Sequence, residues 1–212
     1  MLTRREFMQT ATAAGAAGVA LSSPALAAIA PEMPAARGIV TRMVVDQRAA
    51  MSSAFGATAR AAEITVDAFA DDISPLWRTV LQPAWKAAPT PIAGMTEHGP
   101  LFVLERMGWK HDMRATFRAQ HSTNAEGVLE HEIQGPAEIV DALAAALPAA
   151  GAEFGGLMAQ ALAAHPAGDV AQKHVVVTTD TRVAMAEPIY SFVLAPRAQC
   201  CTLKPYSHNH SA

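Results

Sequence analysis

Residues 39–46 read IVTRMVVD, a short run of mainly apolar side chains that ends in an aspartate. Such a run predicts a buried β-strand. The next segment, residues 48–62, carries Met51 and Phe55 four positions apart among many small side chains, which indicates a helix packed closely on a sheet. Residues 63–69 then alternate apolar and polar side chains, as a second strand would. This part of the chain therefore predicts a β-α-β unit.

The alternation of strands and helices continues further along the chain. Ser74 and Pro75 suit the N-cap and the first position of a helix that we expect to be kinked or interrupted near Pro83. Residues 91–95 predict a third strand, and Pro100 opens the helix that follows it. Successive units of this kind form right-handed crossovers, so we expect parallel strands covered by helices on both faces.

The second half of the chain predicts a hairpin and two late strands. Residues 113–120 and 128–134 alternate and can pair with each other. Opposite charges would then face one another across this hairpin and help to set its register, on Arg114, Arg118, Glu130 and Glu132. The remaining predicted elements are a helical region at 136–165 with a break at 148–151, and strands at 174–179 and 189–194.

The predicted fold is therefore an α/β domain that spans residues 39–196. We expect a single domain, a three-layer sandwich with a mostly parallel sheet and an antiparallel edge from the second half. A short flexible lead-in (28–38) would precede it, and a loosely ordered tail (197–212) would follow.

Composition supports a globular protein with a core of its own. Of the 212 residues, 51% are hydrophobic and 17% are charged, with a net charge of −3. This balance provides no basic surface for nucleic acid or anionic lipid, and we expect neither as a partner. The apolar stretch at 10–21 is too short to span a bilayer, and we expect no later segment of transmembrane length. The two cysteines, Cys200 and Cys201, are adjacent, so no disulfide framework is expected.

The N-terminus resembles the signal of twin-arginine (Tat) exported bacterial proteins. The resemblance rests on Arg4 and Arg5 followed by Phe7, a weakly apolar stretch at 10–21, and a small-x-small cleavage site at Ala25 and Ala27. It implies recognition by the Tat translocase, cleavage near Ala27 (a 1–27 signal) and a soluble periplasmic protein without a membrane anchor. Tat substrates are exported folded, and many carry a redox cofactor or travel with a partner that does. The alternative is a disordered cytosolic tail with a chance arginine pair.

Polar side chains follow the predicted parallel strands at their carboxyl ends, where α/β proteins bind ligands. The candidate catalytic residues are Asp46, Asp71, Asp72, Thr96, His98 and, just past the fourth strand, His121. Carboxylates beside imidazoles could act as general acids and bases or bind a metal. Helix capping and the helix dipole explain several of the same residues without any chemistry.

Other features are less specific. Cys200, Cys201, His208 and His210 are weak candidates for a soft-metal site. His111 and His131 are interpreted as ordinary surface or sheet residues. The chain contains no Gly-rich dinucleotide motif, Walker A loop, CxxCH, CxxC, HExxH or GxSxG motif.

Three hypotheses about function remain open at this point, and the sequence names no cofactor. The favoured one is a non-catalytic accessory subunit of a periplasmic redox system. The second is a small hydrolase or isomerase that uses the Asp/His crevice. The third is a protein that binds a small ligand in the same crevice without turnover.

Overall fold

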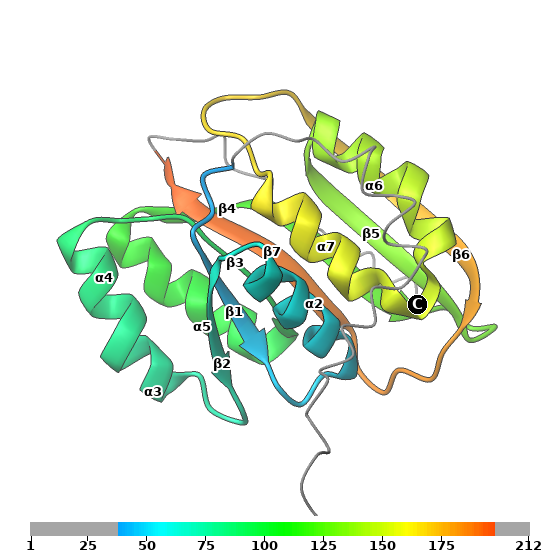
Figure 1. The fold of residues 1–212 in the computed structure, drawn as a ribbon, viewed down its shortest axis with the longest axis horizontal. Helices are drawn as coiled ribbons and strands as arrows, with labels where there is room; N and C mark the ends of the chain where they lie inside the picture. The colour runs from blue at the N-terminus through cyan, green and yellow to red at the C-terminus, as the bar shows by residue number, and fades with distance from the viewer. Residues whose placement is uncertain (1–37, 198–212) are drawn as a thin grey trace, which may run out of the picture.

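The computed structural model describes residues 38–197, which form a single mixed sheet with helices around it (Figure 1). The spatial order of the strands is β2-β1-β3-β7-β4-β5-β6. Their bounds are β1 Arg42–Asp46, β2 Thr65–Phe69, β3 Ile92–Glu97, β4 Met113–Thr123, β5 Val128–Pro136, β6 Gln172–Arg182 and β7 Ile189–Pro196. The α/β class is therefore confirmed. The predicted signal and the tail candidates Cys200, Cys201, His208 and His210 lie outside the described residues.

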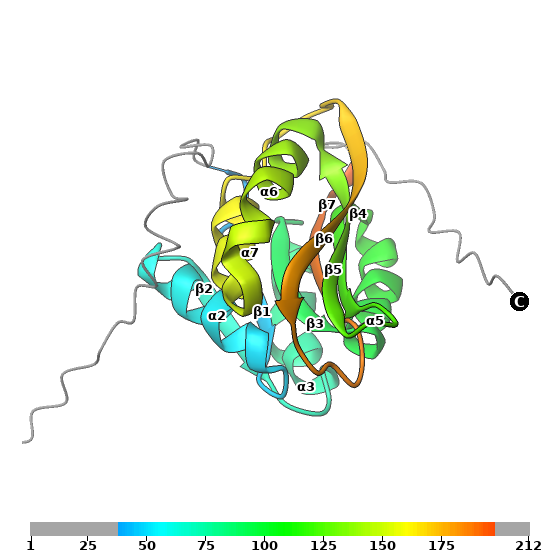
Figure 2. The same ribbon diagram turned by 90° about the vertical axis from the view of Figure 1, so that its right-hand side faces the viewer.

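The helices pack against the sheet in two groups (Figures 1 and 2). The first group is α2 (Ala50–Ala61), α6 (Ala137–Ala150) and α7 (Phe154–Ala163), with the short turn η5 (Gly151–Glu153) before α7. The second is α3 (Ser74–Leu76), the π-helical turn η3 (Trp77–Leu81), α4 (Gln82–Ala87), α5 (His98–Gly108) and the 3-10 turn η4 (Trp109–His111).

Each group of helices closes a separate hydrophobic core, because strand side chains alternate between the two faces of the sheet. Phe55, Leu143 and Leu157 of the first group pack with Val45 and Ile133. The second core contains the side chains of Trp77, Trp85, Leu104, Val44 and Phe192.

The pairing of the strands corrects the expectation of a mostly parallel sheet. Only β1–β2 and β1–β3 are parallel, and the other four pairings are antiparallel. Strand β7 also does not extend an edge but lies between β3 and β4. Every side chain from Ile189 to Ala195 is buried, so this strand needs cover on both faces, which a central position provides.

The β4–β5 hairpin is confirmed, but the expected cross-strand ion pairs are wrong. In the observed register Arg118 lies opposite Gln134 and not opposite a glutamate. Its guanidinium instead forms an ion pair with Glu105 of α5. Arg114 pairs with its near neighbour Asp112. The glutamates Glu130 and Glu132 instead bond to Thr178 and His174 of β6.

The predicted irregularity near Pro83 takes the form of a π-helical turn. In η3 the N–H of Gln82 bonds to the carbonyl of Trp77, five residues back, immediately before the proline. A proline inside a helix lacks the N–H of the normal ladder and its ring crowds the preceding turn, and a wider turn relieves that crowding.

Residues 137–163 are long and apolar enough to cross a membrane by length and composition, contrary to the expectation from sequence. In the structure this stretch is two helices, separated at Gly151, where φ is +53°. Their apolar side chains belong to the core under the sheet. Helix α7 approaches α2 closely at Gly155, where a Cβ atom would lie 2.2 Å from the carbonyl oxygen of Met51.

Candidate functional site

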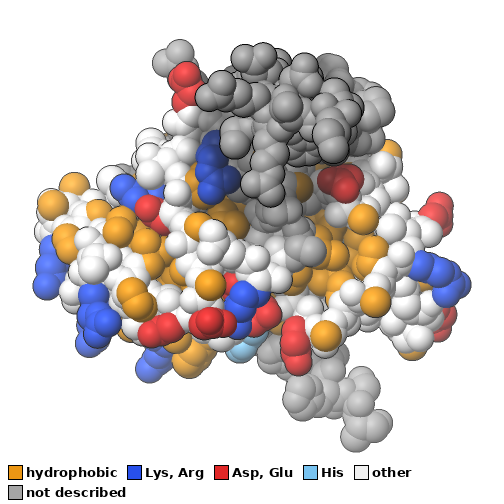
Figure 3. All heavy atoms as spheres, turned by 60° about the horizontal axis from the view of Figure 1, so that its bottom comes forward, with side chains coloured by type: hydrophobic (Ala, Val, Ile, Leu, Met, Phe, Trp, Pro, Cys, Tyr) orange, Lys and Arg blue, Asp and Glu red, His pale blue; other side chains and the backbone are white. Residues whose placement is uncertain are grey.

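The carboxyl ends of β1 and β3 lie where the order of the sheet reverses, because β2 and β3 flank β1 on opposite sides. In α/β proteins such a switch point is where ligands bind. Here it holds Asp46 at the end of β1, Glu97 at the end of β3, and Arg48 in the turn after β1. Acidic side chains gather along this edge of the molecule, which Figure 3 shows from the carboxyl ends of these strands.

Arg48 connects the three carboxylates of this edge. Its Nε donates to Asp46 Oδ1 at 3.1 Å and its Nη2 to Asp46 Oδ2 at 2.8 Å. The same Nη2 donates to Glu97 Oε2 at 3.0 Å, and Nη1 lies 3.9 Å from Asp71 Oδ1. The hydrogen bond with the fully buried Asp46, followed by its charge and those of Glu97 and Asp71, raises the pKa of Arg48. The negative charges of these carboxylates are therefore balanced by the positive charge of Arg48.

The other candidates from the strand ends serve the backbone. Asp72 Oδ1 accepts the N–H of Ser74 at 2.8 Å, at the beginning of α3, and this bond lowers the pKa of Asp72. Thr96 is buried and its hydroxyl donates to the carbonyl of Glu97. Ser74 itself forms no side-chain cap, and it begins the helix as its first residue.

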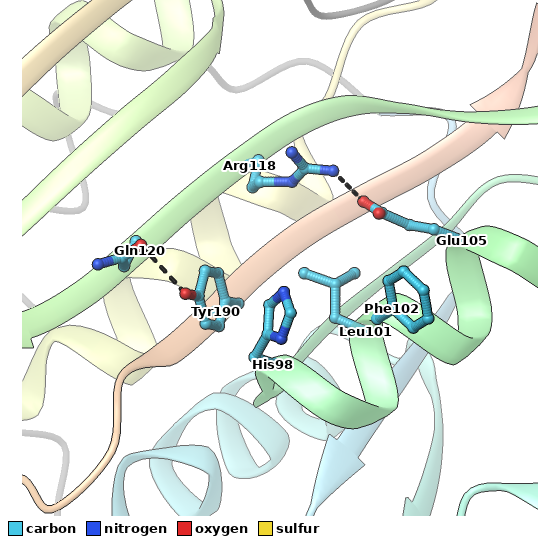
Figure 4. Close-up of a pocket in the computed structure, with 7 residues that line it drawn as sticks. All are labelled: His98, Leu101, Phe102, Glu105, Arg118, Gln120 and Tyr190. Carbon is cyan, nitrogen blue, oxygen red and sulfur yellow. Dashed lines mark hydrogen bonds and ion pairs between the residues drawn. The ribbon is translucent and has the colours of Figure 1, made fainter. Parts of the chain in front are cut away.

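His98 lines a small pocket between α5 and the strands β4 and β7, which we call the α5–β4 pocket (Figure 4). Its lining residues are His98, Leu101, Phe102, Glu105, Arg118, Gln120 and Tyr190. The pocket has a volume of about 60 Å³. The imidazole of His98 lies with its centroid 5.5 Å from the Tyr190 ring. Asp46 is not among the lining residues, so the first and third turns do not share this pocket.

The polar groups of the α5–β4 pocket differ in exposure: His98 is exposed, whereas Glu105 and Arg118 are partly buried and Tyr190 is buried. Arg118 and Glu105 form an ion pair with side chains only 17% and 18% exposed. The hydroxyl of Tyr190 donates to Gln120 Oε1 at 3.1 Å. Burial raises the pKa of Tyr190, and the positive charge of Arg118 opposes that shift. Arg118 Nε is buried and has no hydrogen-bond partner within residues 38–197.

His121 lies on the opposite face of the sheet, in the core under α7. Its Nδ1 is 2.7 Å from Nδ1 of His131, and its Nε2 is 2.9 Å from the hydroxyl of Ser191. The ring of Phe154 contacts both imidazoles. Burial lowers the pKa of His121 well below its usual value and that of His131 to about 4. Both imidazoles are fully buried, so His131 is not a surface residue.

The strand alternation contained a signal for this pair. His131 shares its face of β5 with the buried Leu129 and Ile133, and His121 continues the buried face of β4 after Phe117 and Ala119. No pattern in the sequence predicted the Arg118–Glu105 contact, because it joins a strand to a separate helix.

Comparison with known proteins identifies no family for this chain: no family model, curated protein or solved structure matches it. Within residues 38–197 no group of three or more histidine, cysteine, aspartate or glutamate side chains is arranged to hold a metal ion.

Proposed function

We propose that this chain is an exported periplasmic accessory protein that binds a partner protein of a redox system through α5 and the adjoining pocket. The Tat-like signal supports export and the redox context. The exposed aromatic side chains of the α5 region support partner binding and are the observation that carries the proposal. In this proposal the two helical groups and the sheet form a three-layer sandwich that presents α5 on its surface.

Helix α5 and the turn after it present a stripe of interface-type residues to solvent. Phe102 is 53% exposed and Trp109 is 50% exposed, although both are large and hydrophobic. They lie seven residues apart, about two helical turns, and so share one face. Arg106 lies between them, with its guanidinium carbon 4.5 Å from the centroid of the Trp109 ring. Aromatic and arginine side chains are enriched at the energetic centres of protein interfaces.

The size of the α5–β4 pocket favours part of a large molecule over a whole small ligand. Its volume of about 60 Å³ is far below the ~300–1,000 Å³ of pockets that enclose drug-sized ligands. At about 10–15 Å³ for each water-sized group, it holds roughly four to six heavy atoms. A side chain or a chain end of a partner fits this space.

Removing Arg106 and Trp109 from the exposed stripe is expected to abolish partner binding without unfolding the protein. The variant Arg106→Ser, Trp109→Ser leaves the pocket lining intact and deletes the stacked pair. The control is Val176→Ser, which removes another large exposed side chain, 55% exposed, from β6. In periplasmic cross-linking, one partner band that carries a redox cofactor should appear with the parent and the control and disappear with the double variant. An unchanged band pattern in all three would overturn the proposal.

Export is expected to depend on the arginine pair. Changing Arg4 and Arg5 to Lys keeps the charge but removes the feature that a Tat receptor reads. We expect the unprocessed precursor to accumulate in the cytoplasm, measured by fractionation of a tagged chain. Processing at the parental rate in the Lys–Lys variant would show that another route exports the protein.

A further inference from the structure

We propose that the α5–β4 pocket binds a carboxylate group carried on a short aliphatic body. Within the proposed function, on which this identification of the source rests, the carboxylate belongs to the chain end of the partner. A free short-chain carboxylic acid has the same chemistry, and the experiment below separates the two sources.

The first support is a hydrogen-bond donor without an acceptor. Arg118 Nε is buried and has no acceptor within the described part of the chain. A buried N–H without an acceptor costs free energy, and a ligand oxygen can recover it once the Arg118 side chain shifts to bring Nε to the surface of the pocket. Gln120 lines the same pocket and uses its oxygen to accept from Tyr190, with its NH₂ group on the side away from the other lining residues (Figure 4), where it can report on binding. The pocket therefore selects a group that accepts hydrogen bonds.

The second support is the capacity of Arg118 to serve two carboxylates. Its Nη2 donates to Glu105, and this bond uses only one of the N–H donors of the guanidinium. A guanidinium has five N–H donors in a fixed fork, so one arginine can hold both anions. Glu105 would then lie beside the bound carboxylate and repel it. Arg118 should therefore increase the affinity of the pocket for a carboxylate, and Glu105 should decrease it.

The third support is the apolar wall beside these donors. Leu101, Phe102 and the ring of Tyr190 line the pocket next to the guanidinium (Figure 4). A carboxylate accounts for three heavy atoms of the roughly four to six that the volume admits. One to three further carbon atoms fit, and butanoate matches this limit.

The test follows the side-chain Nε–H of Arg118 and NH₂ of Gln120 by NMR of the ¹⁵N-labelled protein. The probes are butanoate, butylamine, and N-acetyl-Val-Ala with a free or an amidated C-terminus. We expect butanoate to shift both signals with saturation, and butylamine to leave them unchanged. If butanoate and the peptide with a free C-terminus bind but the amidated peptide does not, the ligand is assigned as a chain end. Binding of butanoate alone assigns a free acid and still supports the carboxylate site.

Four variants test whether the charges of Arg118 and Glu105 strengthen or weaken the binding of butanoate. Arg118→Gln is expected to weaken butanoate binding at least about tenfold, and Glu105→Gln to strengthen it by up to about tenfold. Arg118→Lys keeps the charge but loses the fork, and should also weaken binding. The control Arg114→Gln removes an arginine of the same strand that pairs with Asp112 outside the pocket, and should change nothing.

The proposal is overturned if neither carboxylate probe produces saturable shifts, or if Glu105→Gln weakens and Arg118→Gln strengthens binding. Thermal melting of each variant shows that it is folded. If Arg118→Gln is unstable, Arg118→Lys and Glu105→Gln still test the effect of the two side chains on binding. The cross-linking experiment with the Arg106→Ser, Trp109→Ser variant tests only the binding of a partner protein and not the carboxylate site. The two proposals can therefore fail separately.

Discussion

Lowering the pH from 7 to 4.5 is expected to reduce the free energy of unfolding by about 2–3 kcal/mol through His131 alone, since each unit of pKa shift corresponds to about 1.4 kcal/mol. The folded state holds the imidazole neutral with a pKa of about 4, whereas the unfolded chain takes up a proton near pH 6.5. Its stabilisation is therefore complete above about pH 6.5 and is lost as the pH falls toward 4. Burial lowers the pKa of His121 and His165 as well, so both act in the same direction.

The geometry of the pair explains why protonation is so unfavourable. With Nδ1 atoms 2.7 Å apart, one ring donates and the other accepts, so the accepting ring must be neutral. Protonation of both rings would place two N–H donors and two positive charges in contact, with no acceptor between them. No acidic side chain contributes to the pKa shift of either ring. The nearest polar partner is Ser191, and the aromatic contact is Phe154.

The measurement is urea unfolding at a series of pH values from 7 to 4.5. A variant with His121→Phe and His131→Leu removes both titrating groups, and its stability should fall much less over this range. The control His174→Asn removes an exposed histidine that pairs with Glu132, and should retain the parental acid loss. A parent equally stable at both ends of the range, or a double variant that loses as much as the parent, would contradict the expectation.

The substitution Gly155→Ala is expected to cost about 2–3 kcal/mol, in the range of core overpacking. The added Cβ would lie 2.2 Å from the Met51 carbonyl oxygen and 3.4 Å from the nitrogen of Phe55, both of which are backbone atoms of α2. Backbone atoms move only if the whole helix moves, so α2 and α7 must separate and the core between them must loosen.

Gly99→Ala is the matched control, because it is the same change in α5 with no atom within 4 Å of the new methyl group. In a helix, alanine is favoured over glycine by up to about 1 kcal/mol, so this variant should be as stable as the parent or more stable. Equal thermal unfolding midpoints for the two variants would show that α7 does not pack on α2 as described.

The sequence predicted individual elements better than it predicted their neighbours. Alternation and apolar runs identified every strand of the described chain, since they reflect local burial. The order of the strands depends on contacts between distant segments, and the position of β7 was missed for this reason. Its uninterrupted burial is nevertheless a signal for a central strand that an edge position does not satisfy.

The candidate site shows the same limit. The strand ends of β1 and β3 meet as expected, through Arg48, because parallel strands bring their carboxyl ends to one edge. The pocket was missed although His98 was named, because its other residues come from α5, β4 and β7. Their meeting follows from the insertion of β7, which places Tyr190 beside both Thr96 and Gln120.

The central position of β7 also determines when the chain can finish folding. Strand β3 pairs with a segment about a hundred residues later, as Ile92 does with Leu194. Until that segment has been synthesised, β3 and β4 lack their shared neighbour and the buried faces beside them stay open. Contacts so distant in sequence slow folding and keep it from being completed while the chain is still emerging from the ribosome. If the chain is exported folded, as we propose, only full-length chains should acquire the shape that the translocase accepts, and incomplete chains should be retained in the cytoplasm.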